Sequence, residues 1–219
     1  SFVDPALTQD YNINMSGGND KGTYYAGLGY NHSEGLPITS FYERFSFVLN
    51  GSYQVTDWLK TTSNFNYNRA NWNSMPPTQS SEANYFGRIQ SLPPTARFED
   101  EDGNMLLGSN AGDGNQSYQA HRFLRDNQSD KFTMIQAAEA KLHKNVSLRG
   151  SAQWYYDESF IEAFDRDYES SPGNWNQTRS SSAQFDRSFS QTYNATLNFN
   201  KVFPGQHSVD ALLGTEFFD

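Results

Sequence analysis

About eight segments of the sequence alternate between apolar and polar residues. In one of them, Phe65 and Tyr67 alternate with Asn64, Asn66 and Asn68. A period of two belongs to a β-strand whose two faces meet different surroundings. The sequence therefore predicts antiparallel strands that share one apolar and one polar face. The alternating segments are residues 11–15, 23–30, 44–55, 59–68, 132–142, 146–156, 193–199 and 209–213.

Charged residues within these segments belong to the polar parity, and none interrupts an apolar series. This is expected of a sheet whose apolar face touches lipid, because a charge at mid-depth there costs about 2–4 kcal/mol. A soluble sheet also keeps charges off its core face, so the pattern indicates a two-faced sheet in either setting. The charged residues are Arg44, Lys60, Glu139, Lys141, Arg149, Asp157, Asp210 and Glu216.

The connections between the segments alternate between short and long. Transmembrane β-barrels show this order, with short periplasmic turns and longer extracellular loops, whereas a soluble sandwich has no reason to place every long loop at one end. We therefore predict an all-β fold, the wall of an antiparallel transmembrane β-barrel, with long extracellular loops near residues 72–130 and 158–181. The short connections are residues 18–22, 56–57, 143–145 and 201–206, and a further longer loop covers residues 31–41.

Composition agrees with a barrel wall and excludes several other classes. The mean hydropathy is −0.79 and aromatic residues make up 16% of the chain. Disordered chains are poor in aromatic residues, while in a barrel only every second strand residue meets lipid. The chain has no cysteine, which excludes disulfides and thiolate sites, and its net charge of −9 argues against a nucleic-acid partner. It opens on Ser1, without a visible signal peptide, so we expect a mature form or an excised segment.

Two short elements are expected inside the first long loop. Residues 81–92 fit a short helix that Pro93 and Pro94 would end. Residues 98–107 fit a small hairpin or turn around Asp102 and Gly103.

Several segments together resemble the SusC/RagA group of TonB-dependent outer-membrane transporters. Residues 14–30, NMSGGNDKGTYYAGLGY, resemble the group's stretch of SGG, a turn, TYY, small residues and GY. Gly35, Tyr42 to Phe45 and Asn50 resemble the next strand, and Asp57 to Lys60 resemble a periplasmic turn. Later strands are similar over residues 148–156 and 207–216, so the resemblance covers most of the 219 residues.

The resemblance implies a 22-stranded barrel with an internal plug, energy coupling through TonB and a SusD-like surface lipoprotein over the extracellular mouth. It implies a glycan or a peptide as cargo. Residues 1–219 contain neither a plug domain nor a TonB box, and about eight strands cannot close so wide a lumen. We therefore expect the whole chain to be a mid-barrel portion of a longer protein that reaches TonB through an N-terminal part outside it.

Aromatic residues in the predicted long loops are candidates for contact with cargo or partner. They can stack on sugar rings or anchor a partner protein, or they can pack a loop against itself, and the sequence leaves both roles open. Trp58 and Trp154 are instead expected in the aromatic girdles at the membrane surfaces. The loop candidates are Trp72, Tyr85, Phe86, Tyr118 and Trp175.

One acidic turn is a candidate calcium site. Asp100, Asp102 and Asn104 present oxygen ligands within residues 99–104, which Ca²⁺ accepts. No acidic residue closes the loop at the distance that an EF-hand requires, so a solvated acidic turn is the alternative. No other cofactor is expected.

The sequence offers no candidate for an enzyme's active site. The four histidines are scattered, and carboxylate pairs such as Asp165 and Asp167 carry no sign of separate acid and base roles. No G-x-S-x-G elbow, G-x-G-x-x-G motif or P-loop is present. We therefore predict a protein that is not an enzyme.

Two other functions stay open. A siderophore-type TonB-dependent receptor would have the same wall, so the N-terminal extension of the full-length protein and the neighbouring lid protein would distinguish the two. A secreted soluble β-protein that binds glycans through exposed aromatic residues would stay folded and monomeric without detergent.

Overall fold

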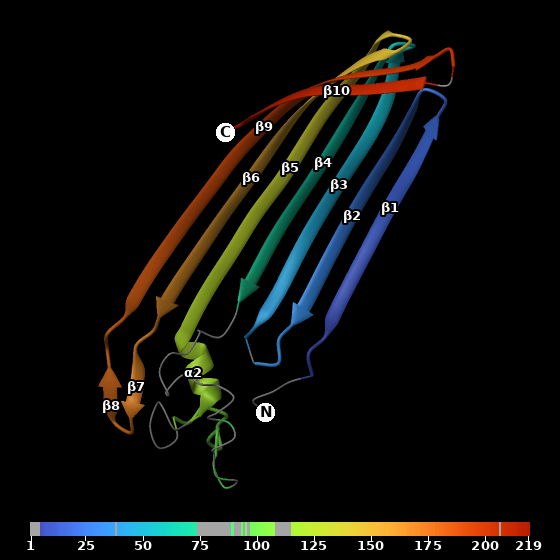
Figure 1. Ribbon diagram of the computed structural model, residues 1–219. Helices are drawn as coiled ribbons and strands as arrows, with labels where there is room; N and C mark the ends of the chain where they lie inside the picture. The colour runs from blue at the N-terminus through green and yellow to red at the C-terminus, as the bar shows by residue number, and fades with distance from the viewer. Residues whose placement is uncertain are drawn as a thin grey trace.

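In the computed structural model, the chain is dominated by one open sheet of eight long antiparallel strands (Figure 1). The structure describes residues 5–37, 39–73, 89, 93, 95, 97–107, 115–205 and 207–219. The order across the sheet is β1-β2-β3-β4-β5-β6-β9-β10, so each strand pairs with the one that precedes it in this sheet. The strands are β1 (Thr8–Asn19), β2 (Gly22–Glu34), β3 (Phe41–Thr56), β4 (Leu59–Asn73), β5 (Phe123–His143), β6 (Val146–Asp165), β9 (Ser180–Phe203) and β10 (His207–Phe218).

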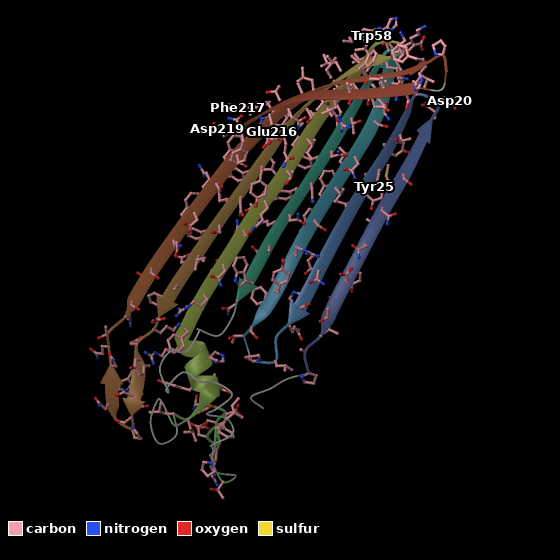
Figure 2. All side chains as sticks on the ribbon, in the orientation of Figure 1. Asp20, Tyr25, Trp58, Glu216, Phe217 and Asp219 are labelled. Carbon is pink, nitrogen blue, oxygen red and sulfur yellow. The ribbon has the colours of Figure 1, made fainter. Side chains whose placement is uncertain are left out.

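The eight strands predicted from the alternation are confirmed. Short turns join β1 to β2, β3 to β4, β5 to β6 and β9 to β10. Asp20 and Trp58, at two of these turns, lie at the same end of the sheet (Figure 2). The strand ends that the longer connections join all lie at the opposite end (Figure 1), as expected of a transmembrane barrel.

The two long loops are shorter than predicted. β5 begins at Phe123, β6 continues to Asp165 and β9 begins at Ser180, so the predicted loop bounds of 72–130 and 158–181 are wrong by up to eight residues. In these extensions polar residues occupy both faces, so the alternation ends while the strand continues. Backbone pairing sustains the strands, for example between Asp130 and Glu158.

Small elements occupy the loop end. The helix α2 (Gln116–Arg122) precedes β5, and β7 (Tyr168–Ser171) pairs with β8 (Asn174–Asn176) in a separate hairpin. The predicted turn in residues 98–107 is confirmed by a bridge between Glu99 and Met105 and by Gly103 at a φ of 81°. The predicted helix over residues 81–92 falls almost entirely outside the described residues. Among the described helices, none has the length and apolar character needed to span a bilayer.

Cross-strand register aligns the apolar residues on one face of the sheet, which we call the apolar face. One row runs across seven strands without a polar side chain other than tyrosine. Directly opposite residues in a sheet point to the same side, so the alternation predicted for single strands extends over the whole sheet. The row is Ile13, Leu28, Phe47, Tyr67, Phe132, Tyr156 and Phe189.

The apolar face carries no second protein layer within the described residues. Leu28 and Leu49 on this face are each 45% exposed. The only buried apolar side chains among the described residues are Leu107 and Ala120, both outside the sheet. Apolar residues of a soluble sandwich would instead be buried against a facing sheet, so the apolar face is arranged for contact with lipid.

Candidate functional site

The height of the apolar face fits the hydrocarbon core of a membrane. On β6 this face runs from Tyr156 to Val146, which is about 33 Å at about 3.3 Å per residue. With the strand tilt of about 35–45° that is usual in such barrels, the height is about 23–27 Å, close to the apolar band of outer-membrane barrels.

A belt of tyrosines and carboxylates bounds the apolar face toward the long loops. The Tyr67 hydroxyl donates to Asp130 at 2.5 Å, and Tyr156 donates in the same way to Glu158. A third pair joins Tyr30 to Glu43 at 3.1 Å. In each pair the ring stays on the apolar face while its hydroxyl reaches the first charged group, the placement preferred at a membrane–water interface. The belt therefore marks where the wall leaves the lipid.

Trp58 and Trp154 were predicted to be girdle residues. Trp58 lies at the end with the short turns (Figure 2) and is 52% exposed. Trp154 lies one row closer to the short turns than Tyr156 and contacts Tyr193 edge-on, with ring centroids 6.2 Å apart. The aromatic row that contains Phe132 and Tyr156 lies nearer to the belt than Trp154 does. The rings of these two residues stack, with centroids 5.2 Å apart.

The opposite face, which we call the polar face, carries the predicted asparagine, serine and threonine side chains. Asn64 and Asn66 both lie on it, as do Thr192 and Asn194. The charged residues predicted on this parity also align, because Lys60 pairs with Glu139 and Glu139 with Arg149. A face of this kind suits a water-filled barrel interior.

A hollow of about 450 Å³ interrupts the polar face near the belt, across β3, β4 and β5. Its floor is made of small residues, because Ala70 pairs directly with Ser129. Ser129 is only 8% exposed, since larger side chains stand around it. We call this recess the β3–β5 hollow; its lining residues are Tyr42, Arg44, Asn68, Ala70, Trp72, Ser129 and Lys131.

Trp72 lies in this hollow and not in a loop as predicted. It belongs to β4 and pairs with Tyr42 on β3 and Asn127 on β5. The Asn127 side-chain amide donates to the Trp72 carbonyl at 3.0 Å, and Asn127 is itself 7% exposed. The loop prediction is wrong because the apolar residues of β4 change parity past Asn68, where Ala70 and Trp72 stand on the polar face and the alternation of the preceding residues is broken.

One ion pair adjoins the hollow. Lys131 Nζ lies 2.8 Å from Asp157 Oδ2, and the Tyr155 hydroxyl donates to the same oxygen at 3.0 Å. Arg44 and Asp157 were both predicted on the polar parity. That Tyr42, Arg44 and Lys131 meet Trp72 could not be predicted, because these residues come from three strands and meet only through the register.

The remaining aromatic candidates do not share one site. Tyr118 lies in α2, where its hydroxyl accepts the Glu169 backbone N–H at 2.9 Å and joins the helix to β7. Trp175 lies in β8 and is 56% exposed. Tyr85 and Phe86 lie outside the described residues. Tyr118 therefore packs the loops against one another, whereas Trp175 remains open for a partner.

The contact made by Tyr118 leads to a testable prediction. Tyr118→Phe removes the acceptor of the Glu169 N–H, and losing a hydrogen bond of this kind costs about 1 kcal/mol. We expect the Glu169 amide to exchange its hydrogen about five- to tenfold faster, as measured by mass spectrometry. Tyr168→Phe is the control, because its hydroxyl accepts only from Asn176. Equal exchange in Tyr118→Phe and the unmodified protein would show that the bond does not hold the hairpin.

In the candidate calcium turn, both oxygens of the Asp100 carboxylate accept hydrogen bonds from other residues of the turn. Its Oδ1 accepts the backbone N–H groups of Asp102 at 2.9 Å and Asn104 at 2.8 Å, and its Oδ2 accepts the Asn104 side-chain amide at 2.9 Å. No group of three or more histidine, cysteine, aspartate or glutamate side chains placed for a metal occurs among the described residues. Calcium binding by Asp100, Asp102 and Asn104 stays a prediction that calorimetric titration can test.

The hydrogen bonds of Asp100, above all the one from the Asn104 side chain, lower its pKa. A lowered pKa in the folded state stabilises the turn fully above the unfolded value of about 3.9. The stabilisation is then lost as the pH falls through the lower folded value. We expect the Asn104 amide proton, followed by NMR, to shift upfield in that acidic range. Asp100→Asn should abolish this titration, and an unchanged titration in the variant would assign it to another group.

No protein-family model and no curated protein matches the sequence. Solved structures do match. The RagAB peptide transporter is 20% identical with a TM-score of 0.78, and the RagAB peptide importer in its closed-closed state is 20% identical with a TM-score of 0.80. Each match covers 96% of this chain and 24% of the other chain, so the chain spans about a quarter of the length of these structures. The ferric-catecholate import receptor Fiu from E. coli K12 is 11% identical with a TM-score of 0.51, over 97% of this chain and 33% of the other.

The eight-stranded sheet, its uncovered apolar face and these matches define the fold as part of a β-barrel wall of the kind found in the matched structures. The resemblance to the SusC/RagA group of TonB-dependent transporters is confirmed at the level of the fold, since both RagAB structures match over nearly the whole chain. The matched structures are described as a transporter, an importer and an import receptor.

Proposed function

We propose that this chain is part of the barrel wall of a TonB-dependent transporter that imports peptides or glycans across the outer membrane. The observation that carries the proposal is the uncovered apolar face, about as tall as a membrane's hydrocarbon core and bounded by the tyrosine–carboxylate belt. The polar face would line the aqueous interior, where numerous weak contacts suit the passage of hydrated cargo.

A SusD-like surface lipoprotein is the proposed partner at the mouth of the barrel. Support comes from the RagAB matches and from the exposed elements at the loop end, including Trp175 on β8. The plug and the segment that contacts TonB would lie elsewhere in the full-length protein. Peptide is the favoured cargo, because the RagAB structures are described as a peptide transporter and importer.

Uptake and co-purification test this proposal together. The full-length protein, expressed in its host, should enter the outer-membrane fraction and bring a surface lipoprotein with it during affinity purification in mild detergent. Uptake of fluorescent peptides should stop when the protonmotive force is dissipated. A protein recovered folded and monomeric in the soluble fraction would contradict the proposal in favour of a secreted β-protein.

A siderophore receptor is the second candidate, supported by the match to Fiu. That match has a TM-score of 0.51, against 0.78 and 0.80 for the RagAB structures. Growth on a ferric catecholate as the only iron source, lost on deletion of the gene, would favour this candidate over peptide or glycan import.

A further inference from the structure

We propose that the β3–β5 hollow binds a carboxylate group of the cargo and that Arg44 is the residue that pairs with it. The inference rests on the proposed function, because it assigns a cargo chemistry to the polar face of the transporter wall. It depends on the balance of charge in the hollow, on the groups around Arg44 and on the size of the recess.

The charge balance leaves Arg44 as the cation available to a ligand. Lys131 is already paired with Asp157 at 2.8 Å. Among the described residues, Arg44 has neither an ion-pair partner nor a side-chain hydrogen bond. It is an exposed residue and lines the hollow. Within the described part of the chain, the hollow therefore presents one positive charge without an acidic partner.

The nearest acidic residue in the same cross-strand row does not neutralise Arg44. Asp10 lies two strands away, with Asn31 between them in the register. Its carboxylate accepts from the Asn31 side chain at 3.3 Å and from the Asn12 side chain. These two amides hold Asp10 on β1 and β2, so Arg44 keeps its charge for a ligand in the hollow.

The residues around Arg44 determine which chemical group next to the carboxylate fits the hollow. A guanidinium pairs with a carboxylate through two parallel hydrogen bonds, and Tyr42 and Trp72 add flat aromatic surface beside it. A volume of about 450 Å³ falls within the usual range of small-ligand sites. The ligand is therefore a carboxylate joined to an apolar or ring-shaped group, which the C-terminal residue of a peptide and a uronic acid of a glycan both provide.

Binding to the full-length protein in detergent, measured by fluorescence polarisation, tests the inference. The probes are labelled Ala-Gly-Ala-Gly-Phe with a free or an amidated C-terminus, and labelled trigalacturonate with free or methyl-esterified carboxylates. We expect at least one free acid to bind about tenfold more tightly than its neutral form, since a hydrogen-bonded charge pair contributes about that factor. Arg44→Gln should remove this preference, and the probe that shows it identifies the source of the carboxylate.

Arg149→Gln is the matched control, because Arg149 lies on the same face but near the short turns, where it pairs in register with Glu139. It should keep the preference for the free acid, while a general effect of luminal charge would reduce the preference in both variants. Binding without a preference for the free acid, or a preference that survives Arg44→Gln, would overturn the inference and leave the proposed function standing. Failure of every probe to bind would contradict both.

Discussion

Leu49→Arg is expected to destabilise the folded barrel by about 2–4 kcal/mol, the cost of placing an arginine at the bilayer midplane on the lipid side of a barrel strand. Leu49 lies near the middle of β3 on the apolar face and is 45% exposed. Because the side chain is already open on one side, little protein packing is lost on its replacement. The cost therefore reports the contact with lipid directly. Urea titration of the full-length protein folded into phospholipid vesicles measures it.

The neighbouring residue provides the control. Asn50 lies at the same depth on the polar face, where it pairs with Asn64. Asn50→Arg should change the free energy of unfolding by no more than about 0.5 kcal/mol, as is usual for a solvated position. Equal losses in the two variants would mean that both faces meet similar surroundings, which would refute the membrane placement of the apolar face. The difference between adjacent residues separates that placement from any general sensitivity of β3.

The sheet could be predicted from the sequence wherever its two faces meet different media. Phe45, Phe47 and Leu49 alternate with polar residues because one parity faces the lipid band and the other faces the polar interior. This contrast carries the strand assignment, and the register then follows from tight turns such as the one at Asp57 and Trp58. All eight strands of the sheet could be predicted from this contrast between the two faces.

The ends of the strands could not be predicted in this way. Past the belt, both faces of β5 and β6 meet water, so no parity of residue is required. The pairs of Asp126 with Glu162 and of Gln128 with Phe160 carry no periodic signal. Only the long-range backbone pairing, which a single sequence does not display, extends these strands.

The candidate site was hidden for a related reason. Trp72 was recognised as an aromatic residue with a possible contact role, but its partners lie far away in the chain and meet it only through the register of β3, β4 and β5. The belt carried a weak local signal, because Tyr156 and Glu158 are two residues apart and so share a face. Tyr67 and Asp130 meet across strands and gave no such signal.

Trp72→Ala is expected to weaken cargo binding about 30-fold while the barrel remains folded. The indole forms one side of the β3–β5 hollow, and a large aromatic side chain in a recess of an interface commonly contributes about 2 kcal/mol or more to binding. Stability should change little by comparison, because the hydrogen bond from the Asn127 side-chain amide to the Trp72 backbone carbonyl survives the substitution. Affinity for labelled peptides and heat-modifiable mobility in detergent gels measure the two properties separately.

Trp175→Ala distinguishes the two contact roles that the sequence left open for the loop aromatic residues, binding of cargo and binding of a partner. Trp175 lies on the β7–β8 hairpin, apart from the hollow, and is 56% exposed. Its loss should weaken the docking of the surface lipoprotein and leave peptide affinity in the isolated transporter unchanged, whereas Trp72→Ala should do the reverse. Because both variants delete the same side chain, a shared effect would indicate a general loss of aromatic surface. Unchanged affinity for both ligands in both variants would remove these two residues from recognition altogether, and the polar side chains of the wall would then have to supply it.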